Sequence, residues 1–302
     1  MEKLLKLASL LGPTGDEGAV ADWLAAETGA MADATLVRIG DNLIVARGAP
    51  RTAIFAHTDT TGYTLGYHRQ LIPIGAPAGR DGDRLRSSDG LCGRLRASPE
   101  GGPLCRLRKV RNAAGEKVEP TPGSRWTYAR QPEIKSGVVR SPYLDNRAGV
   151  WAALRALEEC KHIAVAFCTG EEHHGHGARV CADWLYGQLG IAQALIADIT
   201  WHTRETPCGK GVVISLRDAF TPRQAFLDRV LALADTSQIP HQREIQSSGS
   251  SDGGHLLRSS VPLDWVFVGA PEKAAHSACE RAAVADLEAM AELLAYLVDR
   301  LD

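Results

Sequence analysis

The 302-residue sequence lacks an excess of charge of either sign, because 34 lysine and arginine residues balance 36 aspartate and glutamate residues. This balance argues against a dedicated nucleic-acid-binding protein and against a disordered acidic tail. No apolar run approaches the roughly 18 residues that a membrane-spanning helix needs, so we expect no membrane partner. With 44% hydrophobic residues, the chain has the composition of a globular protein with a sizeable core.

Paired cysteines are also absent. The seven cysteines are scattered, and none of them forms a C-x-x-C pair, so neither a zinc ribbon nor a disulfide framework is indicated. Unpaired thiols fit a reducing compartment, and we expect a cytoplasmic protein. The N-terminal segment carries Lys6 inside its apolar stretch and lacks a small-residue cleavage site, which predicts a helix and not a signal peptide.

Short apolar runs alternate with segments of helical periodicity along most of the chain. This alternation predicts an α/β fold with a mostly parallel sheet and helices on both faces. The expected strands are 34–38, 42–46, 52–56, 163–167, 194–197 and 265–268, and the expected helices are 2–11, 17–29, 146–159, 177–188 and 287–301.

Residues 61–139 follow a different pattern, rich in glycine, proline and arginine and without a helical period. Alternating runs at 84–86, 94–96 and 104–110 suit short antiparallel strands, and Asp89-Gly90 and Glu100-Gly101-Gly102 are turn signals. We therefore predict a small all-β domain, serving oligomerisation or substrate access, inserted into an α/β catalytic domain made of residues 1–60 and 140–302.

The inserted segment is basic. It holds 14 lysine and arginine against 7 aspartate and glutamate residues, a surplus of 7 positive charges, which leaves the rest of the chain with a surplus of 9 negative charges. The arginines could form a solvated face, dock on the acidic part of another subunit, or select acidic substrates.

Side chains that bind metals or move protons follow five apolar runs that we interpret as strands. In an open α/β sheet, ligands bind beyond the carboxyl ends of the strands, so these side chains are expected at one edge. Taken singly, each has a plain structural explanation: the acidic pair could be a solvated loop, and Asp145 a helix N-cap. The residues are His57 and Asp59, Asp145, the pair Glu171-Glu172, Asp198 and His276.

Their coincidence at strand ends favours a metal site. Uncompensated buried carboxylates are costly and must be paired or bind cations. Three carboxylates and two imidazoles suit two zinc-like ions with one carboxylate bridging them. A carboxylate next to a ligand can hold a water and take its proton.

The sequence resembles the M42 family of aminopeptidases over essentially its whole length. The resemblance is carried by motifs that occur in the same order: Gly12-Pro13-Thr14-Gly15-Asp16-Glu17, Ala56-His57-Thr58-Asp59, Leu144-Asp145-Asn146-Arg147-Ala148-Gly149, Gly170-Glu171-Glu172 with Gly177-Ala178, Ala197-Asp198-Ile199-Thr200, Gly209-Lys210-Gly211, Ser250-Ser251-Asp252 and Ala275-His276-Ser277.

The resemblance implies five ligands for two divalent cations, with zinc expected first and cobalt or manganese also compatible. His57 and Asp198 would bind one ion, Glu172 and His276 the other, and Asp145 would bridge them. Glu171 would be the general base, Asp59 the carboxylate that fixes the tautomer of His57, and Asp252 a structural or substrate-side acid.

The implied function is a metal-dependent exopeptidase, an aminopeptidase that removes N-terminal residues from small peptides. The resemblance implies that a metal-activated water would attack the amide carbonyl and that Glu171 would pass the proton to the leaving amine. The resemblance also implies a phosphorylase/hydrolase-like catalytic domain. We further expect a homo-oligomer, dimeric or larger.

The chain departs from the family pattern at Thr60, at His173-His174-Gly175-His176, over 201–207 and in a shorter inserted domain. The ligands are unaffected, so the departures concern the substrate and the oligomer. The histidine cluster could be loop polarity, a substrate contact or a proton relay. Two alternatives stay open: a dinuclear amidohydrolase or deacylase of a small metabolite, and a glycoside hydrolase, which would need two carboxylates about 5–10 Å apart.

Overall fold

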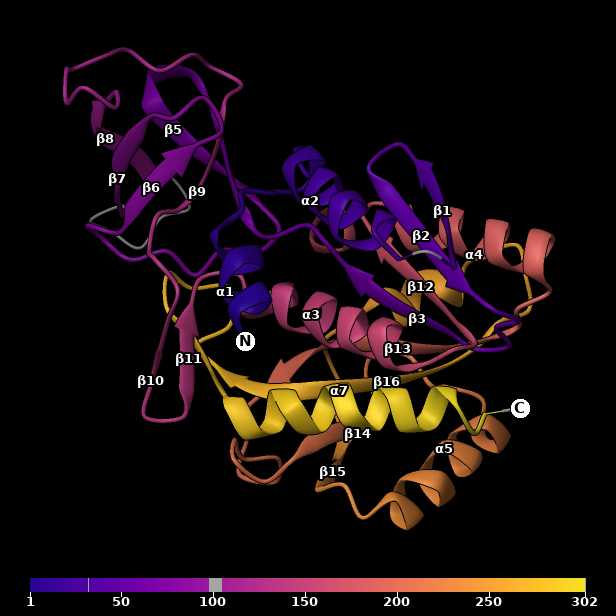
Figure 1. Ribbon diagram of the computed structural model, residues 1–302. Helices are drawn as coiled ribbons and strands as arrows, with labels where there is room; N and C mark the ends of the chain where they lie inside the picture. The colour runs from indigo at the N-terminus through magenta and orange to yellow at the C-terminus, as the bar shows by residue number, and fades with distance from the viewer. Residues whose placement is uncertain (32, 98–104, 302) are drawn as a thin grey trace.

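The computed structural model describes residues 1–31, 33–97 and 105–301, which form an α/β domain with a small β-barrel at one end (Figure 1). The predicted turn at Glu100-Gly101-Gly102 and residue Leu104 of the run 104–110 lie outside these ranges. Within them, no helix is both long and apolar enough to cross a membrane.

A large mixed sheet forms the centre of the α/β domain. Four central strands run parallel, namely β12 (Ile163–Cys168), β3 (Ala53–His57), β13 (Gln193–Trp201) and β16 (Asp264–Lys273). The flanking strands pair antiparallel to their inner neighbours: β1 (Ala34–Ile39) and β2 (Asn42–Arg47) beyond β12, and β17 (Glu280–Ala283), β11 (Val138–Ser141) and β10 (Glu133–Lys135) beyond β16. Two more strands extend from β16, β14 (Val212–Arg217) antiparallel to it and β15 (His241–Ile245) parallel to β14.

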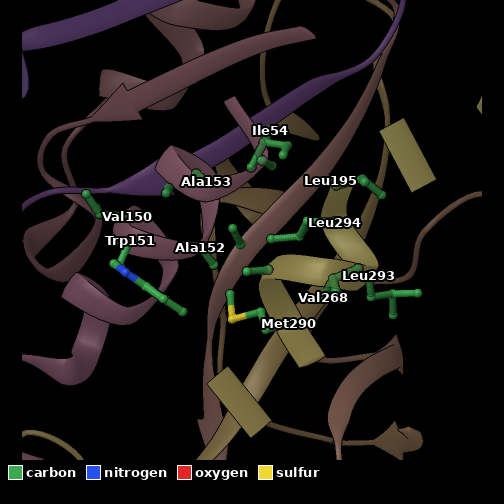
Figure 2. Close-up of a cluster of buried hydrophobic side chains, with 14 of the residues drawn as sticks. Ile54, Val150, Trp151, Ala152, Ala153, Leu195, Val268, Met290, Leu293 and Leu294 are labelled. Atoms are coloured by element: carbon green, nitrogen blue, oxygen red, sulfur yellow. The ribbon is translucent and has the colours of Figure 1, made fainter. Parts of the chain in front are cut away.

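Helices cover both faces of this sheet because successive strand residues point to opposite sides. Ile54 joins the hydrophobic cluster shared with α1 (Glu2–Ser9), α2 (Gly18–Gly29), α3 (Leu144–Glu159), α5 (Gln224–Ser237) and α7 (Val284–Val298). Its neighbour Phe55 joins the cluster shared with α4 (Gly177–Leu189) and α6 (Asp252–Leu256). Figure 2 shows part of the first cluster, with Trp151 of α3, Met290 of α7 and Val268 of β16 among its labelled side chains.

The inserted domain is a closed barrel with its own apolar interior, which includes Leu85 and Trp126. A short 3-10 turn, η1 (Tyr67–Arg69), follows its first strand. Around the barrel the strands follow the order β4 (Gly62–Leu65), β5 (Gln70–Ile74), β8 (Cys105–Arg111), β7 (Cys92–Arg96), β6 (Arg84–Ser87) and β9 (Arg125–Tyr128).

The predicted fold class, an α/β domain with a small separate all-β domain, is confirmed. Several details differ. The prediction omitted β14, α5 and β15, and it ended β13 and β16 several residues early. Strand β10 lies inside the predicted insertion 61–139 but pairs with β11 of the large sheet, whereas the barrel itself spans 62–128.

Candidate metal centre

Five elements bring the predicted ligands to one edge of the sheet. His57 ends β3, and Asp145 lies at the start of α3. Glu172 belongs to η2 (Glu171–His173), the 3-10 turn after β12, and His276 follows β16. Asp198 lies within β13 rather than after it, because that strand continues to Trp201.

The five side chains form two groups that share Asp145. In the first, His57 Nε2 lies 3.2 Å from Asp145 Oδ1 and 3.5 Å from Asp198 Oδ1. In the second, His276 Nε2 lies 3.1 Å from Asp145 Oδ2 and 3.4 Å from Glu172 Oε2. Within each group the possible ligand atoms all lie within 4.8 Å of one another. Asp145 thus presents one carboxylate oxygen to each group.

The backbone around Asp145 is not helical, although it opens α3. Its φ and ψ are −80° and 102°, and those of Asn146 are −121° and 44°. The Gly149 N–H donates to Asn146 Oδ1 at 2.8 Å, so Asn146 caps the helical part of α3, and the alternative that Asp145 caps it is wrong. Asn146 Nδ2 donates to Ala197 O at 2.8 Å, and Asp145 N donates to Glu280 Oε2 at 3.2 Å. These bonds tie Asp145 and Asn146 to β17 and β13.

Asp59 holds the turn that carries Glu171 and Glu172. Its Oδ1 accepts the Glu171 N–H at 3.0 Å, and its Oδ2 accepts the Glu172 N–H at 3.0 Å and the Thr14 hydroxyl at 2.7 Å. Nδ1 of His57 lies 3.2 Å from the backbone carbonyl of Asp59 and 3.4 Å from its carboxylate. The carbonyl therefore contributes to the His57 tautomer, and the carboxylate mainly positions the acidic pair.

The barrel contributes a strap, residues 75–78, to the centre. Ala76 O lies 3.1 Å from His276 Nδ1, and the Ala78 N–H donates to His276 O at 2.9 Å. Gly75 has φ of 67°, and a Cβ there would lie 2.8 Å from Glu172 O. Only glycine therefore fits at the point where the strap meets the acidic turn.

Burial dominates the electrostatics of the centre. It raises the pKa values of Glu171 and Glu172 well above their ordinary range. Burial would also raise the pKa of Asp145, but hydrogen bonds from His276 and His57 lower it below its ordinary value. Glu172 Oε1 is buried without a hydrogen-bond partner in the described part of the chain. An excess of buried carboxylates with an unsatisfied oxygen fits a site for cations.

A cavity of about 190 Å³ opens from this centre and extends away from the ligands. Its farther wall holds Asp218 and Glu244, two acids that the sequence analysis missed because neither belongs to a motif. Among the described residues, no lysine or arginine lines the cavity, so the barrel arginines are not placed to select acidic substrates there. The remaining lining residues beyond the centre are Ile199, Thr200, Trp201, Ser215, Gln246, Gly249, Ser250 and Phe267.

Asp252 and the histidine cluster lie outside this cavity lining. Asp252 is buried at the start of α6, and its Oδ2 has no hydrogen-bond partner among the described residues. His173 is exposed, and its Nδ1 accepts the Gly75 N–H at 3.1 Å, a contact with the strap. His174 and His176 are exposed.

A model of the M42 glutamyl aminopeptidase family matches residues 112–293, more than half of the chain. The fold is similar to aminopeptidase APDkam598 from the archaeon Desulfurococcus kamchatkensis, with a TM-score of 0.86 and 22% identity over 98% of this chain and 93% of that chain. It is also similar to the TET1 peptidase of Pyrococcus horikoshii, described as assembling into a tetrahedron or a large octahedral shell, with a TM-score of 0.82 and 22% identity over 98% of each chain.

An endoglucanase from Thermotoga maritima has a TM-score of 0.75 and 20% identity over 98% of this chain and 96% of that chain. At such identities these structures show the fold alone. No curated protein sequence matches the chain significantly.

Proposed function

We propose that this chain, which belongs to the M42 glutamyl aminopeptidase family, is a dinuclear metal-dependent enzyme that releases N-terminal residues from small peptides. Membership makes it a hydrolase of the aminopeptidase type. The observation that carries the finer proposal is the pair of donor groups that share Asp145.

The residues present fit two divalent cations. His57 and Asp198 would hold one ion, Glu172 and His276 the other, and Asp145 both. Imidazole and carboxylate donors suit zinc, which we propose as the metal, and they also accept cobalt or manganese. Cations in such a site supply Lewis acidity, which polarises a carbonyl group and lowers the pKa of water.

The protein's own part in the reaction is to hold the donors and move a proton. Glu171 belongs to the same turn as Glu172 but to neither donor group, so its carboxylate remains available. We assign it the general base, which takes a proton from the attacking water and delivers it to the leaving amine. The backbone carbonyls at Asp59 and Ala76 hold the two histidine rings in place through Nδ1.

Glu171→Gln tests this assignment. Because the amide cannot accept the proton, kcat on aminoacyl p-nitroanilides should fall about 10²–10⁴-fold, while metal content stays unchanged. Glu288→Gln, an exposed position on α7, is the matched control. A chelator should abolish the activity of the wild-type protein and of Glu288→Gln. Full turnover by Glu171→Gln, or by metal-free protein, would contradict the mechanism.

Two alternatives use the same fold. A deacylase would use the same residues and would prefer N-acyl amino acids over aminoacyl anilides, so a substrate panel separates it. A glycoside hydrolase would cleave a glucan without metal, and an assay of chelated protein on a soluble glucan decides that case.

The charge distribution supports a homo-oligomer, and the TET1 peptidase to which the chain is similar is described as assembling into shells. We propose that the basic barrel, residues 62–128, docks on the acidic α/β domain of another copy. Electrostatic docking should weaken as salt rises. Sedimentation velocity should therefore show assemblies at low salt that dissociate at high salt, and a monomer at low salt would contradict the docking.

A further inference from the structure

The far wall of the cavity contains two carboxylates that the proposed chemistry does not use. Asp218 and Glu244 are only 8% and 6% exposed. Burial raises the pKa of both groups. Arg217 is exposed, and its Nε donates to the backbone oxygen of Asp218 at 3.1 Å rather than to the carboxylate. Within the described residues, no lysine, arginine or histidine nitrogen lies within 4.0 Å of either carboxylate.

Glu244 is held in place with one oxygen available. Its Oε1 accepts the Thr200 hydroxyl at 2.7 Å and the Gln246 amide at 2.7 Å. The same amide nitrogen of Gln246 also donates to Thr200 Oγ1 at 2.9 Å, which closes a triangle of bonds. Because both donors reach Oε1, Oε2 is left for a ligand in the cavity.

The distance from the metal centre suits a long side chain. Thr200 follows Asp198 by two residues on β13, so the two side chains lie on the same face about 7 Å apart. Glu244, bonded to Thr200, lies beyond it. Phe267 and Trp201 also line the cavity, and their apolar surfaces suit a chain of methylene groups.

We propose that Glu244, assisted by Asp218, selects substrates whose N-terminal residue is lysine or arginine. The inference rests on the proposed aminopeptidase function and names its substrate class. The methylene groups lie along the aromatic walls, and the cationic head binds Oε2 of Glu244. A substrate beginning with glutamate would instead bring a third carboxylate beside these two, and no lysine or arginine is among the described lining residues to pair with it, so this pocket rejects it.

Substrate panels on the metal-loaded full chain test the proposal. We expect kcat/KM for lysyl and arginyl p-nitroanilides to exceed that for the norleucyl compound, which has a similar apolar stem without the charge, by tenfold or more. Glu244→Gln keeps the size of the side chain and should lower kcat/KM for the two cationic substrates at least tenfold, with norleucyl cleavage changed less than threefold. Glu288→Gln is the control for removing one acidic charge.

Other outcomes overturn the proposal in distinguishable ways. An equal loss on all substrates would place Glu244 at the substrate α-amino group, and a preference for norleucyl or glutamyl substrates would remove the cation pocket. Both results would leave the aminopeptidase function standing, whereas no cleavage of any anilide would remove both proposals. Calorimetry gives a second readout without turnover: free L-lysine should bind the wild-type protein at least tenfold more tightly than L-norleucine, and Glu244→Gln should remove the difference.

Discussion

The hydrogen bonds of Asp59 allow the effect of the substitution Asp59→Asn on stability to be worked out donor by donor. The N–H groups of Glu171 and Glu172 and the Thr14 hydroxyl donate to its two oxygens, and His57 Nδ1 lies 3.4 Å from Oδ1. Burial opposes ionisation, but hydrogen bonds from His57, Thr14 and Glu172 nevertheless hold the pKa of Asp59 below its ordinary value. Asp59→Asn keeps the shape but replaces one acceptor oxygen with an NH₂ group.

The cost follows from which donor loses its acceptor. In either orientation of the amide, one of the two backbone N–H groups faces the new NH₂ group. The orientation with the NH₂ group toward the Glu172 N–H costs less free energy, because the Thr14 hydroxyl can rotate and accept a hydrogen bond from the NH₂ group. One hydrogen bond to a charged acceptor, about 1.5–3 kcal/mol, is lost, and a buried donor is left unsatisfied. We expect a net loss of about 2–4 kcal/mol in the free energy of unfolding.

The same substitution should also disturb the turn that carries the general base and one proposed ligand. We expect metal affinity to fall about 10–100-fold, with a comparable fall in kcat/KM. Thr14→Val is the matched variant, because it removes one donor and leaves both backbone bonds intact, and it should change each quantity less than threefold. Metal competition with a chromophoric chelator and chemical unfolding measure the effects. Metal affinity and kcat/KM both within twofold of wild type in Asp59→Asn would refute this reasoning.

Two further predictions concern the strap and a buried acid. Gly75→Ala and Gly82→Ala both place a side chain at positive φ, but only at Gly75 would the Cβ lie 2.8 Å from a backbone oxygen, that of Glu172, whereas nothing lies within 4 Å at Gly82. Gly82→Ala should lose about 1 kcal/mol of stability. Gly75→Ala should lose more because of this clash, and of the two variants only it should lower metal affinity. Burial raises the pKa of Glu17 from 4.5 to about 7, so the folded state favours the protonated acid and loses stability as pH rises through this interval. Glu17→Gln should therefore be more stable than wild type at pH 8, by up to about 3 kcal/mol, and equal to it near pH 4 in thermal unfolding; a constant difference at all pH values would contradict the assignment.

The convergence of the five proposed ligands at one edge of the sheet could be predicted from sequence because several of them lie at or just beyond apolar runs. His57 ends a fully buried strand, and Glu172 follows another. The apolar residues of these strands therefore predicted that both side chains lie at the edge of the sheet. Asp198 was found although β13 continues past it. Both faces of β13 are buried along most of its length, so the sequence shows no change in pattern where Asp198 stands. The prediction required only that Asp198 lie near the carboxyl end of the strand, and it does.

The remaining features depend on contacts between distant segments. The hydrogen bonds from Glu171 and Glu172 to Asp59 are made by backbone groups, which carry no sequence signal. Glu244 lies on β15, a strand with a mixed burial pattern that the sequence analysis omitted. Asp218 follows β14, which has the apolar run Val212–Ile214 but no motif beyond it. Their meeting in one cavity required the complete order of the sheet.

The strap formed by residues 75–78 makes the molecule less modular than its two-part appearance suggests. The barrel leaves and rejoins the chain between His57 and Asp145, and on the way it supplies the carbonyl of Ala76 to the ring of His276. A shortened gene that excised the whole insertion would therefore also remove the support of a histidine encoded some two hundred codons downstream. The smallest active version of this protein must keep that tetrapeptide, whatever becomes of the strands around it.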